Sequence, residues 1–179
     1  MQIEKIFGPP GSGKTTFLLD IVHMELENGV SPVKIGYFSF TRKAATEARD
    51  RAILKFPHLN KDTDFPWFRT LHSLAYRCLA MRTQDMMSPM DYRSFAQEAG
   101  IEIGVEGGEE DFMVKVDNPI LNEINIARIK GLDLRTHYNQ SAMDIEWFHF
   151  EYVERAYRHY KESNNLLDFT DLLEKIVES

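Results

Sequence analysis

The chain is poor in cysteine and has no long hydrophobic run. Cys78 is the only cysteine among the 179 residues, so no disulfide can form within one chain. No apolar stretch approaches the roughly 20 residues that cross a bilayer, and the first residues lack the pattern of a signal peptide. We therefore expect a protein without a membrane partner in a reducing, cytoplasmic compartment. Cys78 lies in an apolar stretch, and we interpret it as a small core residue rather than a nucleophile.

Basic residues are also outnumbered overall: 21 Lys and Arg stand against 28 Asp and Glu, and the formal net charge is −7. The basic residues are concentrated, however: ten lie between Lys34 and Arg82, where only four acidic residues occur. A polyanion responds to such a local field rather than to the net charge. The pattern is compatible with a nucleic-acid partner, and equally with a solvated helix face.

The most informative motif lies close to the start of the chain. Residues 8–15 read G-P-P-G-S-G-K-T, which fits the phosphate-binding loop pattern G-x-x-x-x-G-K-[ST]. Glycines let the backbone aim successive N–H groups at phosphate oxygens. The ammonium of Lys14 can reach the β- and γ-phosphates, and the hydroxyl of Thr15 can ligate Mg²⁺. The predicted nucleotide-binding residues are Gly8, Pro9, Pro10, Gly11, Ser12, Gly13, Lys14, Thr15 and Thr16, with Lys14 and Thr15 also assigned catalytic roles.

The residues around this loop support the assignment. We expect a strand at residues 3–7 and a helix over residues 16–26, whose packed face would include Phe17, Ile21 and the region of Met24 and Leu26. A strand, a glycine loop and a helix in this order distinguish a nucleotide site from a chance glycine-rich turn.

The following residues continue the alternation of strands and helices. Residues 34–40 read as a buried parallel strand, and residues 42–56 as a helix that Thr41 caps. A short aromatic strand at 65–68 and a helix at 70–81 follow. The pattern predicts an α/β domain with a parallel sheet.

The middle of the chain shows no further strand–helix alternation. We expect helices at 89–99, 119–130 and 141–162, with a glycine- and acid-rich loop at 100–111. The aromatic residues of the third helix are interpreted as core rather than as ligand-stacking groups. A last helix begins near Asp168.

Four segments together resemble the N-terminal motor domain of UvrD/Rep/PcrA-type superfamily 1 DNA helicases. They occur in the family's order and cover nearly the whole chain. The segments are G-P-P-G-S-G-K-T-T at 8–16, F-S-F-T-R-K-A-A-T-E-A-R-D-R at 38–51, F-R-T-L-H-S-L-A at 68–75 and L-L-D-F-T-D-L-L at 166–173.

The resemblance implies a fold and a division into domains. The fold would be an α/β, incomplete RecA-like P-loop NTPase domain with a parallel sheet, carrying an all-helical insertion. Residues 1–82 and 163–179 would form the ATP-binding (1A) portion, and residues 83–162 a helical 1B-like insertion.

The resemblance also implies ATP and Mg²⁺ as cofactors, and translocation on single-stranded DNA with unwinding at a duplex junction. The partners would be this DNA and a second motor domain. Arg42 stands where the family usually has Asn, and Arg69 where it usually has Gly. Instead of binding DNA, Phe40 could pack in the core and His72 could have a purely structural role. The DNA-binding residues implied are Phe40, Thr41, Arg42, Lys43, Arg69, Thr70, His72 and Ser73.

Two departures limit what the chain is expected to do alone. The family's D-E-x-Q-D segment, which supplies a metal-holding aspartate and a water-activating glutamate, does not follow Leu173. Only seven residues precede Gly8, so Gln2 cannot serve as the family's upstream adenine-recognition glutamine. We expect the chain to be part of a longer helicase that hydrolyses ATP poorly alone. The alternatives are another P-loop NTPase, of the AAA+ or nucleotide kinase type, and a non-enzymatic nucleotide-binding regulatory module.

Overall fold

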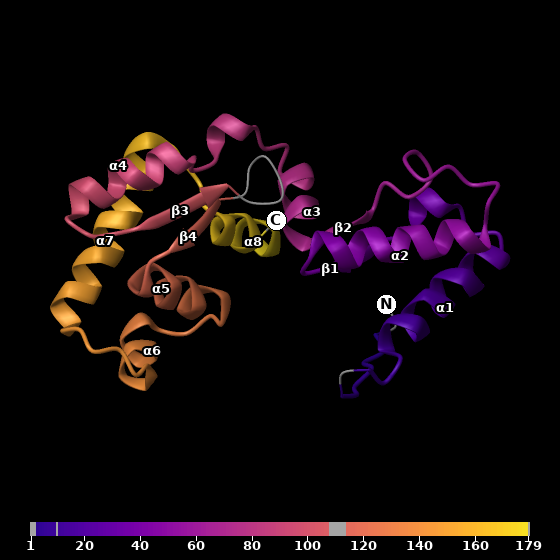
Figure 1. Cartoon of the computed structure of the whole chain (residues 1–179), viewed down its shortest axis with the longest axis horizontal. Helices are drawn as coiled ribbons and strands as arrows, with labels where there is room; N and C mark the ends of the chain where they lie inside the picture. The colour runs from indigo at the N-terminus through magenta and orange to yellow at the C-terminus, as the bar shows by residue number, and fades with distance from the viewer. Residues whose placement is uncertain (1–2, 10, 108–113, 179) are drawn as a thin grey trace. The chain divides into compact units, whose positions relative to one another are not determined.

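The computed structural model describes residues 3–9, 11–107 and 114–178. Its contacts divide the chain into two compact units, residues 1–74 and 75–179. Figure 1 shows the elements of both units along the chain. The predicted domain ranges rest on motif positions rather than on contacts, and they stay a prediction.

The first unit is a small α/β arrangement. Strands β1 and β2 pair in parallel, with Tyr37 opposite Phe68 and Ser39 opposite Thr70, and α2 connects them. This confirms the predicted parallel sheet, although each strand is only three residues long. The elements of this unit are α1 (Lys14–Glu27), the 3-10 turn η1 (Pro32–Lys34), β1 (Tyr37–Ser39), α2 (Arg42–Lys55), β2 (Phe68–Thr70) and the beginning of α3 (Leu71–Cys78).

The core of the first unit lies where α1 and α2 meet the sheet. Ala48 and Ala52 of α2 are almost completely buried, and their small side chains let the helix approach Phe65 and Phe68 closely. Helix α1 contributes Val22, flanked by the partly buried Leu19 and Leu26.

The predicted packed face of α1 is observed only in part. Leu26 packs against the core, whereas Phe17 and Met24 are 45% and 51% exposed, and the other packed residues are Leu19 and Val22. The helix carries apolar side chains on nearly every side, so periodicity alone cannot select the face that packs.

The strand predicted at residues 3–7 is also not observed. These residues have no regular secondary structure, and Ile3 and Phe7 are 69% and 86% exposed. A strand exists only where a neighbour accepts its backbone hydrogen bonds. The described parallel ladder joins β1 to β2 and leaves out this segment.

The second unit is mostly helical. Its largest cluster of buried residues joins α4, α5 and α7, and includes Phe95, Leu121, Ile124, Phe150 and Val153. The helices predicted at 89–99 and 119–130 are confirmed within one residue. Its elements are the end of α3, η2 (Thr83–Asp85), α4 (Pro89–Ala99), β3 (Gly104–Gly107), β4 (Val114–Asp117), α5 (Pro119–Ile129), α6 (Leu134–Gln140), α7 (Trp147–Asn164) and α8 (Phe169–Glu178).

The prediction that residues 83–162 are all-helical is wrong. Strands β3 and β4 form an antiparallel hairpin there, in which Val105 pairs with Val116. The loop was predicted at 100–111; residues 104–107 form β3 instead, and 108–111 lie outside the described residues. Alternation of valine with polar residues at 114–117 is the strand signal that the glycine and acid content masked.

Two smaller predictions also change. Helix α7 begins at Trp147 rather than at Ser141, because a separate short helix, α6, precedes it. Cys78 is exposed at the end of α3 and is not a core residue. Among the described residues, no helix combines the length and the apolar character needed to cross a bilayer.

Candidate functional site

The glycine loop leads directly into α1 and leaves the amides of that helix open. Gly11 and Gly13 have φ angles of 79° and 81°, a left-handed conformation that side-chain-bearing residues rarely adopt. Gly13 is the N-cap of α1, and no side chain accepts from the first turn. The first N–H groups of the helix are therefore available to an anion, which the helix dipole also attracts.

The ammonium of Lys14 lies over the same loop. Its Nζ donates hydrogen bonds to the carbonyl oxygens of Gly8 at 2.6 Å and Pro9 at 2.7 Å, and lies 3.4 Å from Ser12 Oγ. A Cβ on Gly8 would come within 2.5 Å of that hydroxyl oxygen, so a larger residue at this position would displace the Ser12 side chain. The predicted cation and its glycine cradle are thus adjacent.

These groups fit a triphosphate with its metal. Open amides and an ammonium suit phosphate oxygens, and the exposed hydroxyl-bearing residues Thr15 and Thr16 occupy the first turn of α1. A hydroxyl oxygen is the kind of ligand that Mg²⁺ prefers. Pro10 lies outside the described residues. The other predicted nucleotide-binding residues lie in this loop or in the first turn of α1.

The predicted DNA-binding residues follow the ends of β1 and β2. Since Ser39 pairs with Thr70 in a parallel ladder, Phe40 and His72 leave the sheet at the same edge. Phe40 is 83% exposed, so its ring does not pack into the core of this unit in the described structure. His72 is half-buried, and burial lowers the pKa of its imidazole.

Thr41 has a structural role at this edge of the sheet. Its hydroxyl accepts a hydrogen bond from the Ala44 N–H at 3.2 Å and caps α2, as predicted. Its carbonyl oxygen accepts from Ser39 Oγ at 2.7 Å. Arg42 and Lys43 follow in the first turn of α2 and are exposed.

A chain of hydrogen bonds shapes the turn after β2. Arg69 donates from Nε to the Pro66 carbonyl oxygen at 2.5 Å and from a terminal nitrogen to Ser73 Oγ at 3.1 Å. The Ser73 N–H in turn donates to Thr70 Oγ1 at 3.1 Å. Thr70 and Ser73 are buried, so these two hydroxyls position the start of α3 in the described structure. A direct contact between them and DNA stays a prediction.

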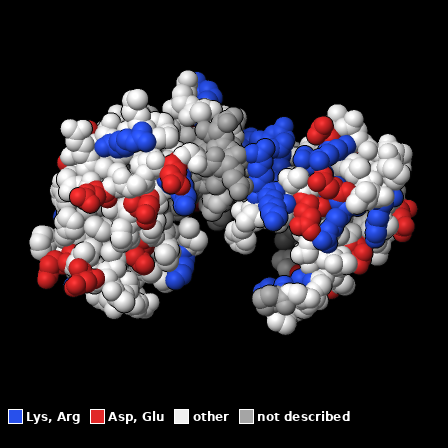
Figure 2. All heavy atoms as spheres, in the orientation of Figure 1, with Lys and Arg blue, Asp and Glu red and all other residues white. Residues whose placement is uncertain are grey.

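The surface charge differs between segments. On the face drawn in Figure 2, Lys and Arg side chains mix with acidic ones over α2. Helix α7 carries three acidic and three basic residues. Around the predicted DNA edge the sequence is free of acid, since no Asp or Glu occurs at 28–46 or at 65–84. The excess of basic residues is therefore local to 28–46 and 65–84, which contain the T-R-K-A-A and T-L-H-S segments.

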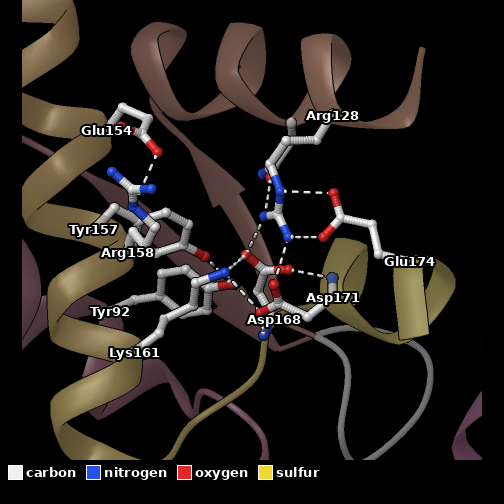
Figure 3. Close-up of polar contacts among 10 residues, drawn as sticks. Tyr92, Arg128, Glu154, Tyr157, Arg158, Lys161, Asp168, Asp171 and Glu174 are labelled. Atoms are coloured by element: carbon white, nitrogen blue, oxygen red, sulfur yellow. Dashed lines mark hydrogen bonds and ion pairs between the residues drawn. The ribbon is translucent and has the colours of Figure 1, made fainter. Parts of the chain in front are cut away.

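The fourth motif forms a buried ion cluster that sequence reasoning missed. Lys161 Nζ lies 2.6 Å from carboxylate oxygens of both Asp168 and Asp171. Arg128 pairs with the same two aspartates and, at 2.6 Å, with Glu174. Figure 3 shows how these groups join α5 and α7 to α8. The cluster borders a cavity of about 300 Å³ whose lining includes Ile124 and Tyr157.

Asp168 and Asp171 also cap α8 reciprocally. The Asp168 N–H donates to Asp171 Oδ2 at 2.7 Å, and the Asp171 N–H donates to Asp168 Oδ1 at 2.8 Å. Two acids three residues apart before an apolar run are a detectable helix-start signal. Nothing local marks Arg128 and Lys161 as their partners.

Comparison with known proteins agrees with the motifs. Residues 3–179 match the UvrD/REP helicase N-terminal domain family. A "Probable DNA helicase" of Mycoplasma pneumoniae (strain ATCC 29342 / M129 / Subtype 1) is 24% identical over 184 residues, which cover 96% of this chain and 33% of that protein. The chain thus spans about a third of the length of that relative. On its motifs and on this match, the chain belongs to the UvrD/REP helicase N-terminal domain family.

Proposed function

We propose that the chain is the ATP-binding N-terminal part of a DNA helicase that moves along single-stranded DNA and unwinds duplex. Residues 1–82 and 163–179 would belong to its first motor domain, and residues 83–162 to an insertion. A second motor domain would complete the ATP site, so the chain alone would hydrolyse ATP poorly.

Each part of the site has a role in this proposal. The amides after Gly13 and the Lys14 ammonium hold the phosphates, and Thr15 helps to hold Mg²⁺. When bound, ATP would supply the free energy through hydrolysis of its phosphoanhydride bond, and Mg²⁺ would neutralise charge on the phosphates. Phe40 stacks on an unpaired base, while Arg42 and Lys43 contact backbone phosphates.

The observation that carries the proposal is the parallel register of β1 and β2. The two segments that distinguish this chain from other P-loop proteins, T-R-K-A-A and T-L-H-S, follow these two strands. They therefore start at one sheet edge, in the same compact unit as the nucleotide loop. An AAA+ enzyme or a nucleotide kinase does not require a DNA-binding edge there.

The first test measures binding of a fluorescent oligonucleotide as salt rises from about 50 mM to about 200 mM. We expect a steep loss of affinity, with a slope that falls by about 0.7 for each phosphate contact removed in Arg42→Ala or Lys43→Ala. Lys130→Ala, an exposed lysine of the second unit, is the matched control and should leave the slope unchanged.

The second test measures nucleotide binding with a fluorescent ATP analogue. Lys14→Ala removes a charge-assisted contact of about 1.5–3 kcal/mol, so affinity should fall at least about tenfold. Lys34→Ala should bind normally. Wild-type protein that binds neither ATP nor single-stranded DNA would refute the proposal, and ATP binding without DNA binding would favour a different P-loop class.

A further inference from the structure

The cavity beside the buried ion cluster of the second unit combines apolar and charged walls. Its volume is about 300 Å³. Helix α5 contributes Ile124, the segment between α7 and α8 contributes Leu166 and Leu167, and α7 contributes the ring of Tyr157. The remaining described lining residues are all charged, and several of them are drawn in Figure 3. A ligand of this cavity would therefore need both an apolar part and a charge.

The ion cluster that borders this cavity has an excess of negative charge. Two cations, Arg128 and Lys161, form its ion pairs with three carboxylates. The carboxylates belong to Asp168, Asp171 and Glu174. One negative charge of the cluster is therefore not balanced by its own cations.

The wall that α7 forms has the same imbalance. Glu154, Arg158 and Glu162 follow one another at intervals of four residues, which places them on one side of the helix, and all three line the cavity. Arg158 pairs with Glu154 at 3.5 Å, so this wall holds two carboxylates and one cation. Arg158 and Glu162 are exposed, which makes the wall accessible from solvent. Together, the wall and the cluster leave two negative charges unbalanced.

Lys161 shows how this environment holds an alkylammonium group. Its Nζ lies 2.6 Å from carboxylate oxygens of both Asp168 and Asp171, and 4.7 Å from the centroid of the Tyr157 ring. Carboxylates and an aromatic face are the partners that an ammonium group prefers. Methylene groups next to a bound ammonium would lose water against Ile124 and Leu166.

We propose that this cavity binds a linear aliphatic polyamine, of which spermidine is an example. Glu154 and Glu162 are about 12 Å apart along the helix, a distance of the order that separates the terminal ammonium groups of an extended triamine. A metal ion has no apolar part, and among the described residues no group of His, Cys, Asp or Glu side chains is arranged to hold one. The inference does not depend on the proposed function.

The test is isothermal titration calorimetry of the full chain with spermidine, at low ionic strength and without nucleic acid. Spermidine should bind saturably. Putrescine has one ammonium group fewer on a shorter chain, so it should bind at least about fivefold more weakly. Mg²⁺ at the same concentration should not displace spermidine, because it cannot use the apolar wall.

Three variants of α7 locate the site. Glu154→Gln removes a half-buried carboxylate and should weaken spermidine binding at least about fivefold. Glu162→Gln removes an exposed one and should weaken it about threefold. Glu151→Gln makes the same change of charge on the same helix outside the cavity lining, so it is the matched control and should bind like the wild type. Circular dichroism and the melting temperature of each variant check that it is folded.

Three results would overturn the polyamine site. The first is the absence of spermidine binding by the wild type. The second is general attraction of cations, shown by equal losses in all three variants or by displacement of spermidine by Mg²⁺. The third is binding of trilysine as tightly as spermidine, which would assign the cavity to lysine side chains of a protein partner. None of these results would alter the assignment of the nucleotide loop or of the DNA edge.

Discussion

Lys161 of α7 and Asp168 before α8 form an ion pair of 2.6 Å in the interior of the second unit, where the two residues are only 7% and 2% exposed. Arg128 of α5 reaches the same carboxylate from another helix at 2.8 Å. The L-L-D-F-T-D-L-L segment, which resembles a helicase motif, thus links α5, α7 and α8. Its two carboxylates form ion pairs with Arg128 and Lys161 within the second unit.

Replacing Asp168 should destabilise the second unit strongly. Asp168→Asn leaves Lys161 and Arg128 with fewer counter-charges, and breaking a buried pair costs about 3–5 kcal/mol. We expect the lower end of this range, because Asp171 still contacts both cations. Urea unfolding followed by Trp147 fluorescence, in a Trp67→Phe background, measures the change.

The exposed pair of Glu151 and Arg155 on α7 provides the control for that variant. Its charged atoms lie 3.6 Å apart, and the side chains of Arg155 and Glu151 are 66% and 41% exposed. Glu151→Gln should change the free energy of unfolding by less than about 1 kcal/mol. Similar losses in Glu151→Gln and Asp168→Asn would contradict a special role for the buried cluster.

Lowering the pH should weaken the ion cluster around Asp168 over a defined pH interval. Burial by itself raises the pKa of Asp168, but the charges of Lys161 and Arg128 outweigh it and lower the pKa to about 2. The pKa is depressed on folding, so the resulting stability is present above the unfolded value of 3.8 and is lost as the pH falls toward about 2. The difference in unfolding free energy between wild type and Asp168→Asn should shrink over this interval. A difference that stays constant down to pH 2 would contradict this assignment.

The left-handed glycine at the start of α1 should not tolerate a side chain. Gly13 has a φ of 81°, and an L-residue in this conformation costs about 1–2 kcal/mol. Gly13→Ala should lower both the stability of the first unit and its affinity for a fluorescent ATP analogue. Gly107→Ala is the control, because a Cβ there meets no atom within 4 Å and φ is not positive. Normal ATP affinity in Gly13→Ala would indicate that this loop does not hold the phosphates.

Thr41 should stabilise α2 through its hydroxyl. Thr41→Ala removes the acceptor for the Ala44 N–H and should cost about 1 kcal/mol of unfolding free energy. Thr41→Ser keeps that oxygen and should restore most of it. Differential thermal unfolding of the three proteins is the measurement, and equal stability of all three would contradict the cap.

Local features of the structure could be predicted because their causes are local. The cap at Thr41, the cap of α4 at Ser88 and the left-handed glycines of the loop each depend on residues within one turn. The parallel pairing of β1 and β2 could also be predicted, since a helix between two strands favours it.

Other features could not be predicted, because partners distant in the sequence choose between locally equivalent alternatives. Helix α1 has apolar residues on opposite sides, and only the position of α2 decides that Val22 packs and Phe17 does not. Residues 3–7 have the pattern of a strand but no described neighbour to pair with.

The sequence by itself determined the phosphate loop, the order of the helicase-like segments and most helix starts, because each of these follows from backbone conformation and hydrogen bonds between near neighbours. Only the tertiary structure decided that Asp168 meets Lys161 and Arg128, and that Phe68 is buried while Phe40 is exposed. Burial and long-range ion pairs depend on which surfaces meet in space, and no short stretch of sequence contains that information.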